Sequence, residues 1–260
     1  MPSLEFFKIL NRHIIFKIFL LSIFLFSSRS VLFAENHLPF AVVELFTSEG
    51  CSSCPPADRL LSQITQETEE KDLPVYTLSF HVDYWNYIGW TDPFSKNIFT
   101  QRQYRYAESL NSSSVYTPQM IINGTKGFSG GNQRKANDLI SQALQNSAAL
   151  NLQLILQKDG QKFFKLFYKL SEVTDDCRLN IAVVEKNLVS QVTQGENAGK
   201  TLRHDHVVRL FSSIDLKKSN GQVVLEIQPG WKKPDLRVIG YMQDKTTMKI
   251  LGAQKINFPL

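Results

Sequence analysis

Two of the chain's three cysteines, Cys51 and Cys54, are separated by two serines and could carry redox chemistry. In a Cys-x-x-Cys pair, one thiol attacks a partner sulfur, and the second closes a disulfide and releases the partner. Pro55 and Pro56 follow directly, and proline is tolerated in the first turn of a helix but not deeper. We therefore expect a helix to begin at the cysteines. Cys51 would then lie beside unsatisfied helix N–H groups and the positive end of the helix dipole, which stabilise a thiolate.

The elements around the cysteines are predicted from hydrophobic periodicity. Residues 41–46 form an apolar, β-branched run typical of a buried strand, and Gly50 breaks it. Apolar residues then recur at helical spacing from residue 57, and we expect this helix to end near Glu70. Residues 73–80 predict a second strand. Strand, helix and strand make a right-handed crossover with parallel strands, so the segment after residue 80 should emerge beside the cysteines.

That segment is rich in aromatic side chains, among them Tyr84, Trp85 and Trp90. One interpretation is that these three form a substrate-binding groove over the redox pair. The other is that they fill the space between the sheet and the next helix, because Tyr and Trp rings serve both purposes. The sequence leaves both interpretations open.

A later strand is expected to open at Pro118 and to end at the hairpin turn Asn123-Gly124. Proline can open a strand where its missing N–H does no harm. If this strand is antiparallel to the first, Thr117 and Pro118 fall at the edge of the sheet that holds Cys51. Helices are expected on either side of it, at about residues 94–110 and 133–146.

Residues 1–34 predict a signal peptide or an N-terminal anchor. Basic residues precede an apolar run at residues 18–26, which has the length of a signal-peptide core and is too short to span a bilayer comfortably. Cleavage is expected after Ala34. Leu32 occupies a position that usually holds a small residue, so an uncleaved membrane anchor is the alternative. Export to the periplasm or the medium would place the cysteine pair in an oxidising compartment, where a disulfide persists.

The predicted order of elements is that of a thioredoxin fold, and three stretches carry a more specific resemblance. The stretches ELFTSEGCSSCPPAD (residues 44–58), SFHVDYW (79–85) and YTPQM (116–120) resemble the secreted bacterial family called domain of unknown function 1223. The resemblance covers essentially all of the chain after the leader. It implies an exported protein with a thioredoxin-like domain and a β-rich extension. The family's activity is not established, so the resemblance implies more about fold than about function.

The resemblance to thioredoxin-like oxidoreductases also implies roles for single residues. Cys51 would be the attacking thiol, Cys54 the resolving thiol, and Pro118 a cis-proline that flanks the disulfide. Thr117, before this proline, resembles the arrangement in some periplasmic disulfide isomerases. The chain departs from thioredoxin at Gly50, where an aromatic residue usually precedes the first cysteine, and at the two prolines after the second. The direction of exchange, whether reduction, oxidation or isomerisation, therefore stays open.

The periodicity changes from helical to alternating near residue 150. We therefore expect residues 38–149 to form an α/β thioredoxin-like domain and residues 150–260 an antiparallel, β-rich, sandwich-like C-terminal domain. No linker rich in Gly, Pro or Ser separates them, so a shared core is also compatible with the sequence. Cys177 lies in the second part. It follows two aspartates whose like charge disfavours a thiolate, and we expect it to be a spectator.

Two residues near the cysteines have both a functional and an ordinary interpretation. Glu44 lies in the apolar first strand, and a buried carboxyl of raised pKa there could exchange protons with Cys54. On a solvated edge it would have no such role. His81 leaves the second strand at the active edge. It could tune the thiolate, with Asp83 orienting it, or it could be an ordinary hydrogen-bonded loop histidine.

A metal site is the alternative to redox chemistry. Its ligands would be Cys51, Cys54 and His81, although zinc and copper sites usually have more ligands than a single Cys-x-x-Cys provides. His204 and His206 would point the same way on a strand, which suits metal binding but is a weak signal. Our leading interpretation therefore contains no metal ion.

Charge gives no case for nucleic-acid binding. The formal net charge of the 260-residue chain is +5, of which +3 lies in residues 1–34, leaving +2 for the rest. The sequence therefore predicts an exported thiol-disulfide oxidoreductase with no cofactor beyond a Cys51–Cys54 redox-active disulfide. Its partners would be protein or peptide thiols and a redox partner protein, and it would meet a membrane only through an uncleaved N-terminal segment. The alternatives are a thioredoxin-like copper- or zinc-binding protein and a non-catalytic envelope module with a structural disulfide.

Overall fold

The computed structural model describes residues 37–172 and 175–259. His37–Leu260 form one compact unit. The expected leader, residues 1–34, lies outside the described residues. Among the described residues, no helix is both long enough and apolar enough to cross a membrane.

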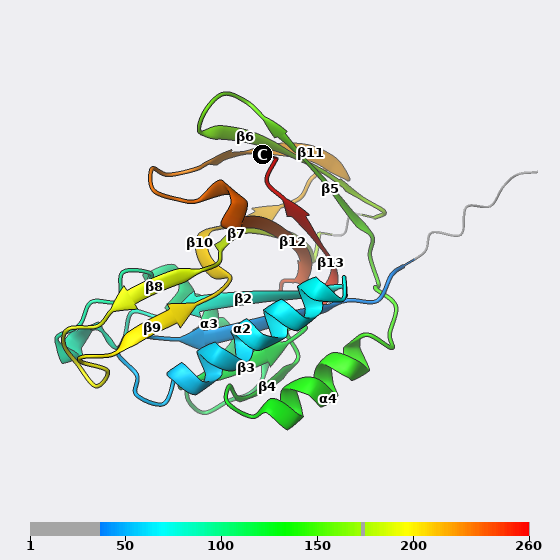
Figure 1. Ribbon diagram of the computed structural model, residues 1–260. Coiled ribbons are helices and arrows are strands. Elements are labelled where there is room, and N and C mark those ends of the chain that lie inside the picture. Colours follow the sequence, from blue (N-terminus) through cyan, green and yellow to red (C-terminus); the bar gives the residue numbers. More distant parts are fainter. Residues whose placement is uncertain (1–36, 173–174, 260) are drawn as a thin grey trace, which may run out of the picture. The chain divides into compact units, whose positions relative to one another are not determined.

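One mixed sheet of eight strands organises the molecule, in the order β13-β12-β7-β10-β2-β1-β3-β4 (Figure 1). Four of its strands come from the first half of the chain and four from the second. They are β1 (Ala41–Thr47), β2 (Val75–His81), β3 (Gln119–Ile122), β4 (Lys126–Ser129), β7 (Cys177–Glu185), β10 (Val207–Asp215), β12 (Leu236–Asp244) and β13 (Ile250–Asn257). β1 and β2 are parallel, as the crossover predicts, and β3 is antiparallel to β1.

Three helices flank the first half of this sheet, namely α2 (Pro55–Glu70), α3 (Asn97–Ser109) and α4 (Gln133–Ala143). All seven residues of β1 are buried, because helices cover both faces of the strand. Val43 and Leu45 pack into the core that contains residues of α2 and α4. Val42 and Phe46, of the opposite parity, pack with residues of α3. Side chains at the end of β1 therefore reach either α2 or α3, according to parity.

The expected division into a domain at residues 38–149 and a sandwich-like domain at residues 150–260 needs correction. β10 pairs with the edge of β2, so the strands of the C-terminal part continue the first sheet. The sequence correctly predicts a β-rich, mostly antiparallel second half, in which β7 pairs antiparallel with both β10 and β12. It could not predict the joining of the sheets. An alternating pattern shows which face of a strand is buried but not which other strand it pairs with.

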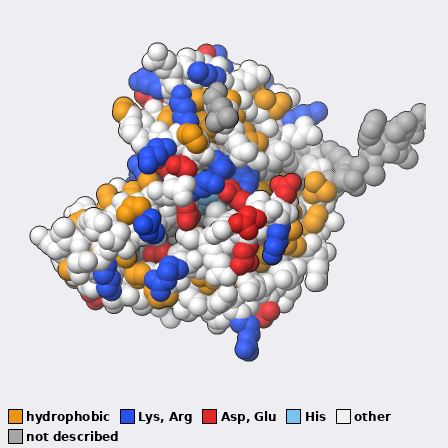
Figure 2. Space-filling view, viewed as in Figure 1, with side chains coloured by type: hydrophobic (Ala, Val, Ile, Leu, Met, Phe, Trp, Pro, Cys, Tyr) orange, Lys and Arg blue, Asp and Glu red, His pale blue; other side chains and the backbone are white. Residues whose placement is uncertain are grey.

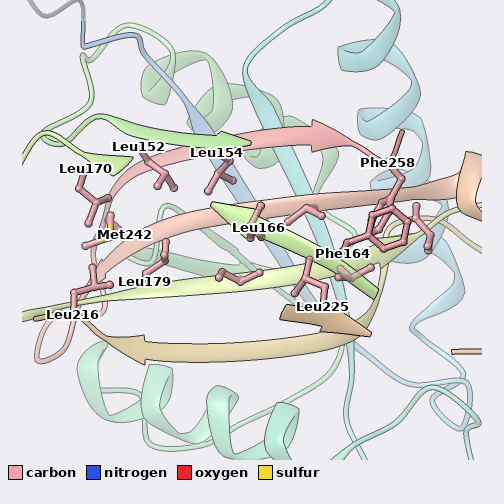
Figure 3. Close-up of a cluster of buried hydrophobic side chains, with 14 of the residues drawn as sticks. Leu152, Leu154, Phe164, Leu166, Leu170, Leu179, Leu216, Leu225, Met242 and Phe258 are labelled. Atoms are coloured by element: carbon pink, nitrogen blue, oxygen red, sulfur yellow. The ribbon is translucent and has the colours of Figure 1, made fainter. Parts of the chain in front are cut away.

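A smaller antiparallel sheet forms a second layer over the C-terminal strands, in the order β11-β6-β5. Its strands are β5 (Leu152–Lys158), β6 (Phe163–Leu170) and β11 (Asn220–Glu226). Figure 3 shows the core between the two sheets, to which Leu154 and Phe164 of the small sheet and Leu179 and Met242 of the large one contribute. The third cysteine, Cys177, belongs to this core and is a buried free thiol, as a spectator would be.

Charged side chains from the two halves of the chain meet at the end of α2. The carboxylate of Glu69 lies 2.9 Å from Lys186 Nζ and 3.3 Å from Lys255 Nζ. Arg237 Nε and His206 Nε2 each lie 3.5 Å from it. His206, Lys186 and Lys255 hold the pKa of Glu69 well below its usual value. Figure 2 shows acidic and basic side chains gathered on this face, where α2 meets the strands of the second half.

A separate hairpin lies against α2. It consists of β8 (Leu188–Gln191) and β9 (Thr201–His204), which form a two-stranded antiparallel sheet of their own. β9 contacts α2, so the far end of the hairpin approaches the turn that holds the cysteines (Figure 1). The 3-10 helices η1 (Asn86–Ile88) and η2 (Lys233–Asp235) complete the elements of the described residues.

Candidate functional site

Cys51 and Cys54 form a disulfide, with their Cα atoms 5.4 Å apart. Cys51 lies in the turn after β1, and Cys54 is the N-cap residue of α2, with a proline at the first helical position. The two half-cystines are only 1% and 0% exposed, whereas Ser52 and Ser53 between them are exposed. The position of the pair is as predicted from the sequence, but its sulfur atoms are enclosed.

The helix N-terminus has no free N–H group to offer the thiol, which corrects an expectation from the sequence. Cys54 N donates to Cys51 O at 3.2 Å. Ala57 N and Asp58 N both donate to Cys54 O, at 2.8 and 3.1 Å, and the two residues before them are prolines without an N–H. The helix dipole remains, but a Cys51 thiolate would have to find its hydrogen bond elsewhere.

The hydroxyl group of Ser53 is placed to supply that hydrogen bond, because its Oγ lies 3.3 Å from Cys51 Sγ. In the reduced protein, Ser53→Ala should lower the alkylation rate of Cys51 at neutral pH by about threefold to tenfold, since a hydrogen bond to the thiolate is lost. The measurement is the iodoacetamide reaction of Cys51 followed by mass spectrometry. Ser52→Ala is the control. Equal rates for the two variants would show that the Ser53 hydroxyl does not stabilise the thiolate.

The Thr117–Pro118 peptide bond is cis, as the resemblance implied for Pro118. Pro118 lies near the first turn of α2, because a Cβ added to Gly130 would be 3.1 Å from Pro118 Cβ and 3.2 Å from Ala57 Cβ. Gly130 N also donates to Pro118 O at 2.9 Å. The structure therefore brings the cis-proline to the same end of the sheet as the disulfide.

The three aromatic residues proposed as a groove direct their polar atoms into the protein. Trp85 Nε1 donates to Thr117 Oγ1 at 2.7 Å, and Trp90 Nε1 donates to Glu49 Oε2 at 2.8 Å. Tyr84 is half-buried, and burial raises its pKa to about 12. This geometry favours the space-filling interpretation of these side chains.

Trp85 also explains the departure from thioredoxin at Gly50. A Cβ added to Gly50 would lie 3.1 Å from Trp85 Cβ, within a tight contact that a larger side chain would disturb. Gly50 therefore lies in close contact with Trp85, which comes from the loop after β2. The structure places Trp85 between the cysteine turn and the strand that follows Pro118.

A buried cluster of acidic and imidazole groups lies beside the cysteine turn. His81 Nδ1 is 2.7 Å from Asp92 Oδ2, and His204 Nε2 is 3.1 Å from Glu49 Oε1. The two imidazole rings are 4.9 Å apart in an edge-on arrangement. The fifth member, Asp58, has its carboxylate 3.9 Å from His204 Nδ1. All five side chains are buried, and His81 and Asp58 come from the end of β2 and the first turn of α2.

The ion pair of this cluster is His81 with Asp92. Burial opposes the charged form of His81, but the Asp92 carboxylate outweighs it and raises the pKa of His81. Burial likewise opposes the charged form of Asp92, but His81 and the hydrogen bonds from backbone N–H groups lower the pKa of Asp92. For Asp58 burial dominates, and its pKa is raised. Asp58 Oδ1, His81 Nε2 and His204 Nδ1 are buried without a hydrogen-bond partner in the described part of the chain.

One of the two interpretations of His81 had Asp83 orienting it, and the structure contradicts that interpretation. Asp83 Oδ1 accepts a hydrogen bond from Thr100 Oγ1 at 2.6 Å, whereas Asp92 is the partner of His81. Asp92 lies eleven residues further along an irregular loop, and no periodicity links the two positions. Sequence analysis also did not identify Glu49 as a partner of His204, since that contact joins residues 155 positions apart.

The alternative metal ligands are not brought together in this state of the protein. Among residues 37–172 and 175–259, no three His, Cys, Asp or Glu side chains are arranged to hold a metal ion. Cys51 and Cys54 are bonded to each other, and His81 is paired with Asp92. His204 and His206 do not point the same way, because His206 has a φ of 48° and its Nδ1 lies 2.7 Å from Thr77 Oγ1.

Glu44 is buried, but it lies on the other face of the sheet from the cysteine helix. It has the parity of Val42 and Phe46, which pack with α3. Its Oε1 is 2.7 Å from Arg102 Nη2 and accepts a hydrogen bond from Tyr241 at 2.9 Å. The geometry therefore does not support proton exchange between Glu44 and Cys54. It gives Glu44 a place in a buried ion pair instead.

The sequence model of a family described as "Protein of unknown function (DUF1223)" matches residues 42–243. The chain belongs to the DUF1223 family. The matched range includes the disulfide, the cis-proline and the buried cluster, as well as the β8–β9 hairpin and strands of the second half. The DUF1223 unit therefore extends across the residue-149 boundary, in agreement with the continuous sheet.

Two solved structures are similar to this DUF1223 chain. A crystal structure of a protein from Agrobacterium tumefaciens aligns with a TM-score of 0.63 and 27% sequence identity, covering 85% of this chain and 95% of that one. A domain of the outer membrane lipoprotein Omp28 from Porphyromonas gingivalis aligns with a TM-score of 0.30 and 8% identity, covering 43% of this chain and 88% of that one. No curated protein matches the sequence.

Proposed function

We propose that this protein is an exported, thioredoxin-like thiol-disulfide oxidoreductase that exchanges disulfides through Cys51 and Cys54. The observation that carries the proposal is the disulfide at the junction of β1 and α2. Two further features support it. The elements from β1 to α4 follow the order expected of a thioredoxin fold, and a cis-proline lies near the first turn of the cysteine helix.

The exchange proceeds through a mixed disulfide. A substrate thiolate attacks Cys51 Sγ, the bond to Cys54 breaks, and Cys54 leaves as a thiolate that takes up a proton. A second substrate thiolate then attacks the substrate sulfur of the mixed disulfide, forms the substrate disulfide and releases the sulfur of Cys51. The substrate dithiol loses two electrons and the Cys51–Cys54 pair gains them. The reverse sequence reduces a substrate disulfide.

The reactants follow from this chemistry. The substrates are protein or peptide thiols, and a second redox protein restores the starting state of the pair in the periplasm or outside the cell. The disulfide itself is the only redox group that the proposal requires. The N-terminal segment, if it is not cleaved, is the route by which the protein would be held at a membrane.

The reduction potential of the pair tests this proposal. The N–H groups of the helix N-terminus are already bonded or replaced by proline, so the reduced thiolate lacks the backbone hydrogen bonds that would raise the reduction potential. We therefore expect a value near the reducing end of the range of redox catalysts, about −270 mV rather than about −120 mV. The measurement equilibrates metal-free protein with glutathione or dithiothreitol buffers and traps thiols by alkylation. A reduction potential below about −300 mV would be that of a structural disulfide and would contradict the proposal.

The burial of both sulfur-bearing residues favours a second candidate, a non-catalytic envelope module with a structural disulfide. The two candidates differ in what happens when both cysteines are replaced by serine. If the disulfide is structural, it closes only a short loop, so replacing both cysteines by serine should disturb mainly the local order of the binding face. An exchange catalyst should lose all ability to reduce or oxidise a model dithiol peptide while its fold is retained.

A further inference from the structure

The disulfide cannot react in the conformation described here, because Cys51 is only 1% exposed. Thiol-disulfide exchange requires the attacking sulfur to reach the Cys51 sulfur along the direction of the S–S bond. Ser52 and Ser53 are open to solvent, so the turn itself reaches the surface. Something packed on the turn must therefore move before a protein thiol can reach Cys51.

One segment that lies on the turn is residues 192–200, the connection between β8 and β9, which we call the strap. The side chain of Asn197 is fully buried, and its Nδ2 donates to Glu49 O at 2.8 Å and to Cys51 O at 2.9 Å. The carboxylate of Glu196 accepts a hydrogen bond from Ser52 N at 2.9 Å. The strap is thus bonded to the backbone of the cysteine turn on both sides of Cys51.

The strap is built as a small closed loop that can move as a unit. Val192 N donates to Lys200 O at 3.0 Å, and Gly199 N donates to Val192 O at 2.8 Å, so its two ends are tied to each other. Gly195 and Gly199 adopt φ values of 74° and 81°, which glycine reaches without strain. These internal bonds do not depend on the cysteine turn. The contacts made by Asn197 and Glu196 can therefore break while the loop keeps its shape.

The base of the hairpin is held separately. His204, at the end of β9, pairs with Glu49 within the buried cluster described above. This anchor lies beyond the strap, so the hairpin stays attached to the protein when the tip is released. Apart from Asn197, residues 193–200 are exposed or half-buried, whereas His204 and Glu49 at the base are buried. A segment with few buried contacts is typical of one that opens locally.

We propose that the strap is an autoinhibitory gate over the disulfide. In the closed state shown here, Asn197 and Glu196 hold it on the cysteine turn, and in the open state Cys51 is exposed to a partner's thiol. The purpose of the gate rests on the proposed exchange chemistry. Its test does not, because the rate of disulfide reduction can be measured whatever the protein's function is. The gate governs how fast the disulfide is reached, whereas the reduction potential governs which redox state is favoured at equilibrium.

The test is the rate at which dithiothreitol reduces the disulfide in the full-length protein at neutral pH. Asn197→Asp replaces the donating amide by acceptor oxygens that face two carbonyl groups, so both hydrogen bonds are lost. We expect reduction to be at least about tenfold faster in this variant. Thr193→Ala, an exposed position in the same strap, is the matched control and should reduce at the wild-type rate.

A second readout separates gate opening from general unfolding. Hydrogen exchange of the Ser52 amide, which is bonded to Glu196, should speed up in Asn197→Asp, while amides of β1 and β2 keep their protection. Equal reduction rates in wild type and Asn197→Asp, with the fold intact, would overturn the gate. Faster reduction accompanied by lost protection in β1 would overturn it as well, since the protein would then be unfolding. A potential below about −300 mV with a strap-dependent rate would leave the gate standing and remove the proposed function.

Discussion

Glu44→Gln is expected to lower the free energy of unfolding by about 3–5 kcal/mol, because it leaves a buried cation without its counter-charge. The side chains of Glu44 and Arg102 are both fully buried, with Nη2 and Oε1 2.7 Å apart. An amide at position 44 keeps the size of the side chain but not its charge. The measurement is urea denaturation of the full-length protein, read as the shift in midpoint at unchanged slope.

The surroundings of Arg102 explain why this pair should matter so much. The guanidinium group lies 5.0–5.6 Å from the ring centres of four aromatic residues. Tyr106 and Tyr241 both donate hydrogen bonds to the Glu44 carboxylate. Burial raises the pKa of both tyrosines well above the usual value, so they remain neutral donors. Water has no access to replace the lost carboxylate.

Two controls define the result for Glu44. Lys162 and Glu226 form an exposed ion pair at 2.7 Å, and Glu226→Gln should cost less than about 1 kcal/mol. The double variant Glu44→Gln/Arg102→Met removes both charges and should recover part of the loss, which a double-mutant cycle measures. A loss in Glu44→Gln no larger than in Glu226→Gln would contradict the buried ion pair. A changed reduction potential of the Cys51–Cys54 pair in Glu44→Gln would instead support proton exchange between Glu44 and Cys54.

Asp92→Asn is expected to destabilise the protein by about 3 kcal/mol near pH 6 and to flatten its pH dependence. Asp92 Oδ2 pairs with His81 Nδ1 at 2.7 Å and accepts a hydrogen bond from Glu49 N at 2.8 Å. A neutral amide cannot hold the charge on His81. The histidine would then be buried in its uncharged form, and the ion pair would be lost.

The pH range in which the His81–Asp92 pair stabilises the protein follows from the directions in which the two pKa values are shifted. The pKa of His81 is raised above 6.5, so its contribution is fully present below pH 6.5 and is lost as the pH rises through its folded value. The pKa of Asp92 is lowered below 3.8, so its contribution is present above pH 3.8 and is lost as the pH falls through its folded value. The pair should therefore stabilise the protein most between these two limits.

The prediction is checked by urea denaturation at pH values from about 4.5 to about 8.5, which lie on both sides of the ordinary pKa of histidine, about 6.5. Wild type should lose stability relative to Asp92→Asn above pH 6.5, so the two curves converge at high pH. Asp83→Asn is the matched control, because Asp83 is bonded to Thr100 and not to a histidine. A flattened pH dependence in Asp83→Asn, with Asp92→Asn unchanged, would restore the orientation of His81 that the sequence suggested.

The elements around the cysteines were predictable because their signals are local. The helix was expected to begin at the cysteines and to end near Glu70, and α2 spans Pro55–Glu70 with Cys54 as its N-cap. A proline can occupy only the first turn of a helix, so its position alone sets the start. The second strand was expected at residues 73–80 and is Val75–His81. The stretches that resemble DUF1223 also identified the family correctly.

Tertiary structure alone decided what surrounds the disulfide. Gly50 packs against Trp85, and the histidine at the end of β2 pairs with Asp92. The strap that lies on the cysteine turn comes from residues about 145 positions further along the chain. Local sequence propensity carries no information about contacts between residues so far apart. The continuation of β2 by β10 is of the same kind. Periodicity specifies which side of an element is buried, and turn residues specify where it ends. Which distant element covers that side depends on packing complementarity over the whole core, which no local pattern encodes.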